Sequence, residues 1–271
     1  MPPAASDTDG NTAERSGKID EVAGPSVTWL GHATAVAELG AARFLFDPLM
    51  RSRTRAAGKV DAVLVTHSHV DHLNRWSLKA VDRDCHLVVP KGARQIVEDL
   101  GFRQLSEVDV GDQLEIGGSV VTAVGTRHDH GRWRKSQGPV ALGYVVAGGG
   151  AALHHGGDID FSDHAVFDDI GKQHDRLDAT LLPIGGMLPV WYYRRRRALL
   201  DRGVHIDPDC ALDIFERLGA KTLVPVHWGT VNLRFGLPSM PSKRLAQVAA
   251  ERSVGGVQIL AHRERLVLTP R

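Results

Sequence analysis

The sequence lacks the cysteines, the charge imbalance and the long apolar run that would each suggest a particular class of protein. It has two cysteines, Cys85 and Cys210, without C-x-x-C spacing, so we expect no disulfide framework and a reducing compartment. The 33 basic and 32 acidic side chains give a net charge of +1, which gives no reason to expect nucleic acid as a partner. The longest mostly apolar stretch, residues 143–153, is too short to span a bilayer.

The first 25 residues lack a basic start followed by an apolar stretch, which argues against a signal peptide. They are rich in Ser, Asp, Gly and Ala, a composition typical of disordered segments. We therefore expect a disordered tail over residues 1–25 and one domain over residues 26–271. We also expect a soluble, cytoplasmic protein with no transmembrane segment, and a homo-oligomer is compatible with this sequence.

The sequence does contain many short β-type runs, interrupted by a few segments with helical spacing. The runs predict strands at residues 27–30, 35–39, 43–46, 60–65, 87–89, 120–124, 142–146, 151–154, 179–182, 222–226, 257–260 and 265–268. Helical spacing occurs at residues 94–100, 211–218 and 244–251. Asp207-Pro208 predicts a helix start, and Gly219 predicts its end. This order favours a layered α/β fold with sheets in the middle and helices outside.

Fourteen histidines are present, and three of them lie in the motif HSHVDH at residues 67–72. The preceding run, DAVLVT, is apolar almost throughout and is expected to be a buried strand. His67 and His69 follow its end and, by alternation, point the same way, with Asp71 and His72 next. Imidazole nitrogens and a carboxylate are ligands that suit Zn²⁺, so this motif predicts a metal site.

The motif H-x-H-x-D-H after an apolar strand resembles the signature of the metallo-β-lactamase-fold hydrolases. Three further pieces follow in the order of that family: VGTRHDHGRW with His128, ALHHGGDIDF with Asp158, and LVPVHWGT with His227. The resemblance covers about residues 26–235. It implies a four-layer αββα sandwich in a single domain, with the active site at one edge of the sheets.

The resemblance implies two divalent metal ions, zinc first, with manganese or iron as alternatives. The implied ligands are His67, His69 and His128 for one ion and Asp71, His72 and His227 for the other, with Asp158 as the bridge. His130 competes with His128, and Asp160 competes with Asp158 but is expected to cap the following segment instead. At least one of His154 and His155 is expected in the core or in an outer, supporting position.

The segment VTWLGHATAVAELGAARFLFDPLM narrows the resemblance to the branch of ascorbate-6-phosphate lactonase and the phospholipase D that hydrolyses N-acyl-phosphatidylethanolamines. The phospholipase side is favoured by HWGT at residues 227–230 and HIDP at residues 205–208. Within this branch we expect His32 to line the pocket and Asp47 to hold a ligand imidazole by a hydrogen bond. The short polar tail, in place of a longer region for membrane contact, argues against a phospholipid substrate.

The segment WYYRRRR at residues 191–197 is aromatic and basic, and it precedes a predicted helix. We expect Trp191, Arg194 and Arg195 to form one wall of the pocket, because arginines bind phosphate in bidentate fashion. The alternative is a solvated basic helix face with no role in binding.

The resemblance implies a hydrolase in which a hydroxide bridging the two ions is the nucleophile. Asp71 would orient that hydroxide, and His205 would steady or protonate the leaving group. The favoured substrate is a small phosphodiester or a related anionic molecule. A lactonase or amidohydrolase of the same fold is an alternative, and a non-hydrolytic metal-binding or iron redox protein is a second one.

Overall fold

The computed structural model describes residues 24–128, 139–161, 164–186, 205–230 and 239–269. Three sequence-based predictions lie outside these residues: nearly all of the N-terminal tail, the competing ligand His130, and the segment Trp191–Arg197 with Arg194 and Arg195. No described helix combines the length and the apolar character needed to cross a bilayer.

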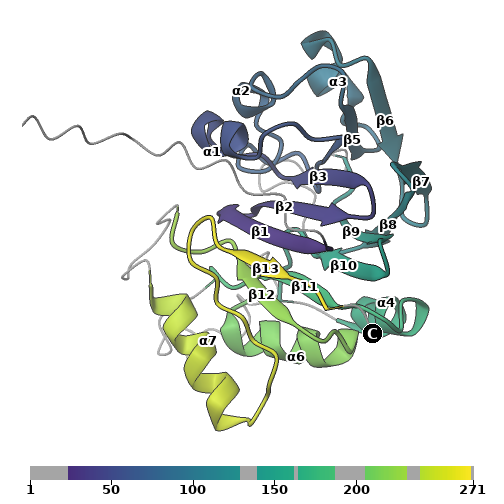
Figure 1. Ribbon diagram of the computed structural model, residues 1–271. Coiled ribbons are helices and arrows are strands. Elements are labelled where there is room, and N and C mark those ends of the chain that lie inside the picture. The colour runs from purple at the N-terminus through teal and green to yellow at the C-terminus, as the bar shows by residue number, and fades with distance from the viewer. Residues whose placement is uncertain (1–23, 129–138, 162–163, 187–204, 231–238, 270–271) are drawn as a thin grey trace, which may run out of the picture.

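Two β-sheets pack face to face, and helices cover the outer face of each (Figure 1). The first sheet has the order β13 (Arg265–Val267), β1 (Ser26–Gly31), β2 (Thr34–Leu39), β3 (Ala42–Phe46), β4 (Ala62–Leu64), β5 (His86–Pro90) and β6 (Gln104–Val108). The second has the order β12 (Leu223–Val226), β11 (Ala179–Pro183), β10 (Ala151–His155), β9 (Leu142–Gly148), β8 (Ser119–Gly125) and β7 (Gln113–Ile116). The outer face of the first sheet is covered by helices α1 (Arg51–Ala56), α2 (Arg75–Leu78) and α3 (Arg94–Val97). The outer face of the second sheet is covered by α4 (Ala165–Gln173), α6 (Pro208–Leu218) and α7 (Met240–Glu251).

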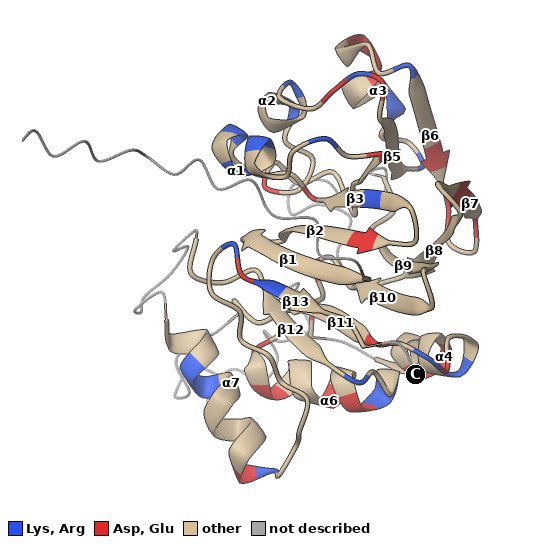
Figure 2. Ribbon diagram, viewed as in Figure 1, with Lys and Arg blue, Asp and Glu red and all other residues tan. Residues whose placement is uncertain are grey.

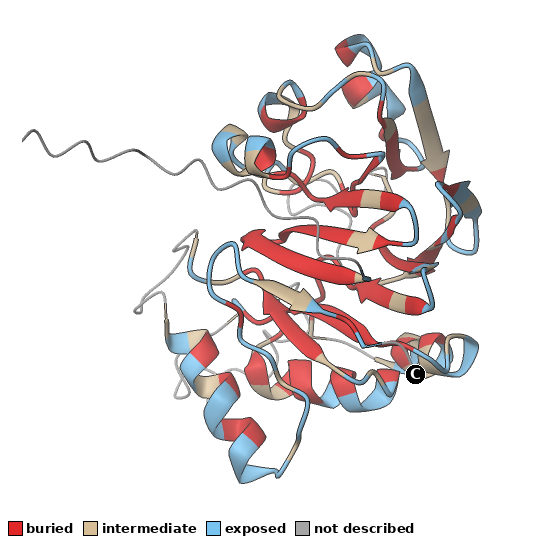
Figure 3. Ribbon diagram, in the orientation of Figure 1, coloured by how far each residue is buried: buried red, intermediate tan, exposed pale blue. Residues whose placement is uncertain are grey.

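Three apolar clusters hold these four layers together. One lies between the sheets and includes Phe44 and Phe46 from β3 and Tyr144 from β9. A second lies between the second sheet and α4, α6 and α7, and a third lies between the first sheet and α1 to α3. Figure 3 shows most strands buried along most of their length, with β6, β7 and β13 as exceptions. Figure 2 shows the charged residues mainly on helices and turns. The predicted four-layer αββα sandwich is therefore confirmed.

Local sequence explains several element ends. Asp207 accepts a hydrogen bond from the backbone N–H of Cys210 at 3.0 Å, Pro208 occupies the first turn of α6, and Gly219 ends the helix in a left-handed conformation. Both cysteines are buried and unpaired, and burial raises the pKa of Cys85 to about 12.

The structure differs from the sequence-based prediction in three places. Strands β6 and β7 were not predicted; they have only five and four residues, most of them exposed or half-buried. Residues 257–260 do not form a strand, because only Val257 makes a bridge, with Leu223. Helices α1, α2 and α4 were not predicted. The first two have only six and four residues, and α4 buries only Phe167 and Ile170, which is too little for a clear helical period.

The strand ends that carry the motif residues meet at one edge of the two sheets. β4 leads into His67, β8 into His128, β10 into Asp158 and β12 into His227. The sheets are joined beside this edge, where Leu142 donates its backbone N–H to the Thr66 carbonyl at 2.9 Å.

Candidate metal centre

The first group of candidate ligands is the three-histidine cluster, formed by His67, His69 and His128. His67 Nε2 lies 2.9 Å from His69 Nδ1, and His128 Nε2 lies 3.1 Å from that same atom. Two ligands of a tetrahedral zinc ion, each at ~2.0–2.1 Å from the metal, lie about 3.3 Å from each other. The three nitrogens therefore have the spacing of ligands around one cation.

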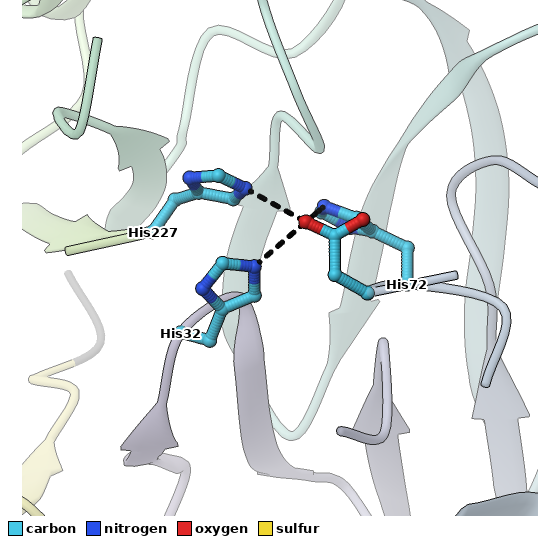
Figure 4. Close-up of side chains that lie close together, drawn as sticks. His32, His72 and His227 are labelled. Atoms are coloured by element: carbon cyan, nitrogen blue, oxygen red, sulfur yellow. Dashed lines mark hydrogen bonds and ion pairs between the residues drawn. The ribbon is translucent and has the colours of Figure 1, made fainter. Parts of the chain in front are cut away.

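The second group is the aspartate cluster, formed by His32, Asp71, His72 and His227. Their candidate ligand atoms all lie within 4.8 Å of one another. Asp71 Oδ2 lies 3.6 Å from His227 Nε2 and 3.9 Å from His72 Nε2. Figure 4 shows the rings of His32, His72 and His227 directed toward a common point, with dashed lines for the contacts of His32 and His227.

Asp158 lies between the two clusters, and its side chain is almost fully buried. Its Oδ1 lies 3.2 Å from His227 Nε2 and 3.3 Å from His72 Nε2, in the aspartate cluster. Its Oδ2 lies 3.8 Å from His67 Nε2, in the three-histidine cluster. Gly157 makes this turn possible. It has φ +63°, and a Cβ there would lie 2.9 Å from Thr66 Cβ.

His205 completes the arrangement, with Nδ1 at 3.3 Å from Asp158 Oδ2 and 14 % of its side chain exposed. Its side chain is more accessible to solvent than that of Asp158, which is 1 % exposed. Burial lowers the pKa of His205 to about 4.

Outer partners hold three of the imidazoles through their second nitrogen. His72 Nδ1 lies 2.8 Å from Asp47 Oδ2, and His128 Nδ1 lies 3.2 Å from Asp160 Oδ1. The Thr66 hydroxyl donates to Asp47 Oδ2 at 2.7 Å and can accept from His67 Nδ1 at 3.0 Å. Such contacts fix the tautomer that leaves Nε2 free to bind a metal. Asp160 thus contacts a candidate ligand, a contact that the sequence-based interpretation of Asp160 as a cap did not include.

Several buried polar atoms of the site have no hydrogen-bond partner among the described residues. They are His72 Nε2, His227 Nε2, Asp158 Oδ1 and His205 Nδ1. A buried polar atom without a partner costs about 1–3 kcal/mol. Here these atoms point at one another from several strands, so a cation between them would satisfy them together. The donor set of imidazoles and carboxylates fits zinc, and also manganese or iron.

The electrostatics of the site keep its carboxylates ionised. Burial alone would raise the pKa of Asp158, but the neighbouring His227 and His72 hold that pKa well below its usual range. Burial would lower the pKa of His72, but Asp158 and Asp47 raise it well above the ordinary value. Burial, with His72 adjacent, lowers the pKa of His67. A cation held by these groups would compete with a proton on His72.

The backbone around the site is strained. Of the six described non-glycine residues with positive φ, three belong here: His32 at 54°, Asp47 at 40° and His227 at 58°. The left-handed conformation costs roughly 1–2 kcal/mol for a residue with a Cβ atom. A hydrogen bond from the His227 N–H to the His32 carbonyl, at 2.9 Å, helps to hold two of them. Backbone strain of this kind concentrates at functional sites.

The structure brings together all seven residues of the implied ligand set, and it adds His32 and His205 to them. His32 was expected only to line the pocket, and its contact with Asp71 was not foreseen. A histidine in a Gly-His turn gives no signal for a partner 39 residues away. His154 and His155 are fully buried inside β10, and their ring nitrogens contact Thr180 Oγ1 and the Ala33 carbonyl rather than either cluster.

Curated relatives resemble the chain over most of its length. It is 28% identical over 250 residues to the uncharacterized protein Rv0906 of Mycobacterium tuberculosis, and the match covers 83% of this chain and 64% of that protein. It is 30% identical over 204 residues to UPF0173 protein PF0020 of Pyrococcus furiosus, and the match covers 75% of this chain and 83% of that protein. N-acyl-phosphatidylethanolamine-hydrolyzing phospholipase D 1 of Caenorhabditis elegans is 26% identical, and the match covers 75% of this chain and 63% of that protein. The chain therefore spans less than two thirds of the mycobacterial and nematode relatives.

Solved structures share the fold at low sequence identity. CmlA, a diiron β-hydroxylase from Streptomyces venezuelae, superposes with a TM-score of 0.71 at 19% identity, covering 90% of this chain and 54% of CmlA. The isothiocyanate hydrolase from Delia radicum gut bacteria has a TM-score of 0.70 at 16% identity, and the match covers 91% of this chain and 100% of that enzyme. A family model, the Beta-lactamase superfamily domain, matches residues 31–228. This match covers most of the described fold and every candidate ligand, so the chain belongs to the beta-lactamase superfamily.

Proposed function

We propose that the protein is a metal-dependent hydrolase with two divalent cations, one in the three-histidine cluster and one in the aspartate cluster. The observation that best supports this proposal is the position of Asp158. Its Oδ1 faces His72 and His227 at 3.3 and 3.2 Å, while its Oδ2 faces His67 at 3.8 Å. A carboxylate with one oxygen toward each ligand cluster is suited to bridge two ions.

Two ions bound in this way would supply Lewis acidity and lower the pKa of a water so that it can act as a nucleophile at neutral pH. Asp71, with 29 % of its side chain exposed, would contribute one ligand and orient the attacking water. His205, whose side chain is more exposed than that of Asp158, would steady or protonate the leaving group. We propose zinc as the metal, with manganese or iron as alternatives.

We propose a small anionic substrate, with a phosphodiester first. Support comes from the relative named as a phospholipase D and from the HWGT and HIDP segments. A half-buried cation, Arg53, also lies near the aspartate cluster: it donates to Thr230 Oγ1 at 3.1 Å, and that atom accepts the His32 N–H at 3.0 Å. The two buried, unpaired cysteines are compatible with the cytoplasm as the proposed location.

Elemental analysis of the protein reloaded with Zn²⁺ or Mn²⁺ tests the binuclear site, with two ions per chain expected. Asp158→Asn keeps the shape but removes the bridging charge, so it should lose at least one ion and nearly all hydrolysis. Asp178→Asn is the matched control, because Asp178 is also buried and accepts the Ala152 N–H at 3.0 Å at the far end of β10. Fewer than two ions in the wild type, or equal behaviour of the two variants, would refute the binuclear proposal.

A substrate screen separates the reaction classes that this site could catalyse. Zinc- and manganese-loaded protein would be assayed on bis(4-nitrophenyl) phosphate, a γ-lactone and an N-acyl amide. Turnover of the phosphodiester above the other two supports the proposed substrate class, and preference for the lactone or amide refutes it. Hydrolysis of none of them, together with iron as the retained metal, would favour the redox alternative.

A further inference from the structure

His32 is the one candidate ligand that comes from the first two strands. It lies in the turn between β1 and β2, and its backbone makes three contacts beyond that turn. The His32 N–H donates to Thr230 Oγ1 at 3.0 Å, and its carbonyl accepts from the His227 N–H and from Trp29 Nε1, each at 2.9 Å. These contacts hold His32 in the left-handed conformation with its ring inside the site.

The His32 ring contacts Asp71, and Figure 4 shows this ring close to the rings of His72 and His227. His32 Nε2 lies 3.1 Å from Asp71 Oδ2. The same oxygen also lies 3.6 Å from His227 Nε2 and 3.9 Å from His72 Nε2. His32 therefore either binds the second cation itself or holds the carboxylate that binds it.

The second ring nitrogen distinguishes these two roles. A histidine that binds a metal through one nitrogen almost always donates its other N–H to an acceptor. His67, His72 and His128 each have such a partner, in Thr66, Asp47 and Asp160 respectively. His32 Nδ1 is buried and has no partner among the residues that the structure describes. The missing acceptor favours a ring with its proton on Nε2, which then donates to Asp71 Oδ2.

Asp71 is a half-buried candidate ligand that a further contact can hold in place. Its side chain is 29 % exposed, whereas those of His72 and Asp158 are almost fully buried. Its neighbour in the loop, Val70, is 78% exposed. An exposed carboxylate on such a loop can rotate into solvent, and the buried His32 ring is positioned to restrain it.

We propose that His32 is a positioning residue, whose Nε2–H donates to Asp71 Oδ2 and keeps that carboxylate directed at the second metal position without binding the metal itself. This inference rests on the proposed function, because it takes Asp71 as a ligand of the second ion.

Two variants of His32 separate donation from ligation. His32→Gln places an amide N–H close to the position of Nε2, so it keeps the donor. His32→Asn tolerates the left-handed backbone, as Asn does more readily than most residues, but it is too short to reach Asp71. Asp71→Asn identifies the binding step that belongs to the aspartate cluster. His86→Gln is the control, because the His86 ring is hydrogen-bonded to Ser106 Oγ, at 2.8 Å, within the first sheet and away from the two clusters.

Metal-free protein would be titrated with Zn²⁺ against a chromophoric chelator to give two stepwise affinities. Asp71→Asn should abolish one of the two zinc-binding steps. We expect His32→Asn to weaken the affinity of that same step by roughly 10–100-fold, the usual cost of losing an outer partner of a ligand. The other step should stay within about threefold, as should both steps in His32→Gln and His86→Gln. Unchanged zinc affinities in His32→Asn would overturn the proposal. An equal loss of affinity in His32→Asn and His32→Gln would also overturn it, because that result is expected if His32 binds the metal directly.

Long-range ¹H–¹⁵N correlation spectra give a readout that does not depend on the number of ions. We expect the His32 proton on Nε2 both in the metal-free and in the zinc-loaded protein, with a shift of that proton in Asp71→Asn. A proton on Nδ1 in the zinc-loaded protein would overturn the proposal. If the wild type binds fewer than two ions, the binuclear function fails on its own measurement, while the metal-free spectra still decide the role of His32.

Discussion

This protein contains two kinds of buried histidine: core histidines and candidate metal ligands. His154 and His155 are fully buried on β10, and Asp158 follows them directly after the strand. His155 accepts the Gly157 N–H at Nδ1 and donates from Nε2 to the Ala33 carbonyl, at 3.1 and 3.0 Å. Both of its nitrogens are used by the backbone, whereas the candidate ligands direct Nε2 or Nδ1 at one another. Burial alone therefore does not mark a ligand.

A buried nitrogen without a partner does not mark a ligand either. His154 Nε2 has no hydrogen-bond partner among the described residues, as is true of His72 Nε2 and His227 Nε2. The His154 ring lies edge-on to Phe167, with centroids 6.4 Å apart, while its Nδ1 contacts Thr180 Oγ1. His72 and His227 instead converge on Asp158 Oδ1 within 3.3 Å. Convergence on a shared carboxylate is the feature that separates the two kinds.

The same substitution at one histidine of each kind should give the largest contrast. His72→Gln is expected to remove one of two bound ions and to lower hydrolysis by far more than the ~10–100-fold typical of an outer partner. His154→Gln should keep both ions and lower only the free energy of unfolding. Both variants would be compared by elemental analysis of metal content and by turnover on one substrate. Similar metal content in the two variants would show that His72 and His154 do not differ as metal ligands.

The carboxylates behind the ligands should give the next largest effect. Asp47→Asn and Asp160→Asn remove charged partners of His72 and His128, so each should weaken metal binding or turnover by roughly 10–100-fold. The sequence-based interpretation of Asp160 as a cap predicts almost no loss at that position. Stepwise zinc affinities distinguish the two, and a wild-type affinity in Asp160→Asn would restore the capping interpretation.

His155→Phe should change stability without changing the number of ions. Phe keeps the ring stacked on Phe46, whose centroid lies 4.8 Å away, but it leaves the Gly157 N–H and the Ala33 carbonyl unpaired. We expect the free energy of unfolding of the metal-free protein to fall by about 1–3 kcal/mol. Chemical denaturation measures this change. Loss of an ion at saturating zinc would show that His155 belongs with the site histidines.

The smallest effect should be a pH dependence of stability from His154. Burial lowers the pKa of His154 to about 3, whereas the unfolded chain has a value of about 6.5. Only the unfolded state gains this proton between those values, so the stabilisation is complete above about pH 6.5 and is lost as the pH falls toward 3.

Between pH 7 and pH 5.5 this histidine alone should cost about 1 kcal/mol of unfolding free energy. Denaturation of the metal-free wild type and of His154→Gln at both pH values measures the cost. Equal pH dependence in the two proteins would contradict the prediction.

The sequence by itself was sufficient for the layered fold and for the positions of most strands, because short apolar runs bounded by turns have few other solutions. It also indicated which residues follow strand ends, since HSHVDH places three histidines and an aspartate directly after a buried run. Short elements escaped it: α1 and α2 have six and four residues, fewer than two turns of helix, so they carry no measurable period.

Only the tertiary structure decided which polar groups become partners. His32 and Asp71 lie 39 residues apart, and His128 and Asp160 lie 32 apart. The His227 N–H reaches the His32 carbonyl from the other sheet. Such pairs depend on the packing of two sheets and on left-handed backbone at His32, Asp47 and His227, a conformation that is uncommon for any residue other than glycine. Spacing along the chain reveals ligands that follow one strand, but contacts between strands of different sheets follow from packing alone.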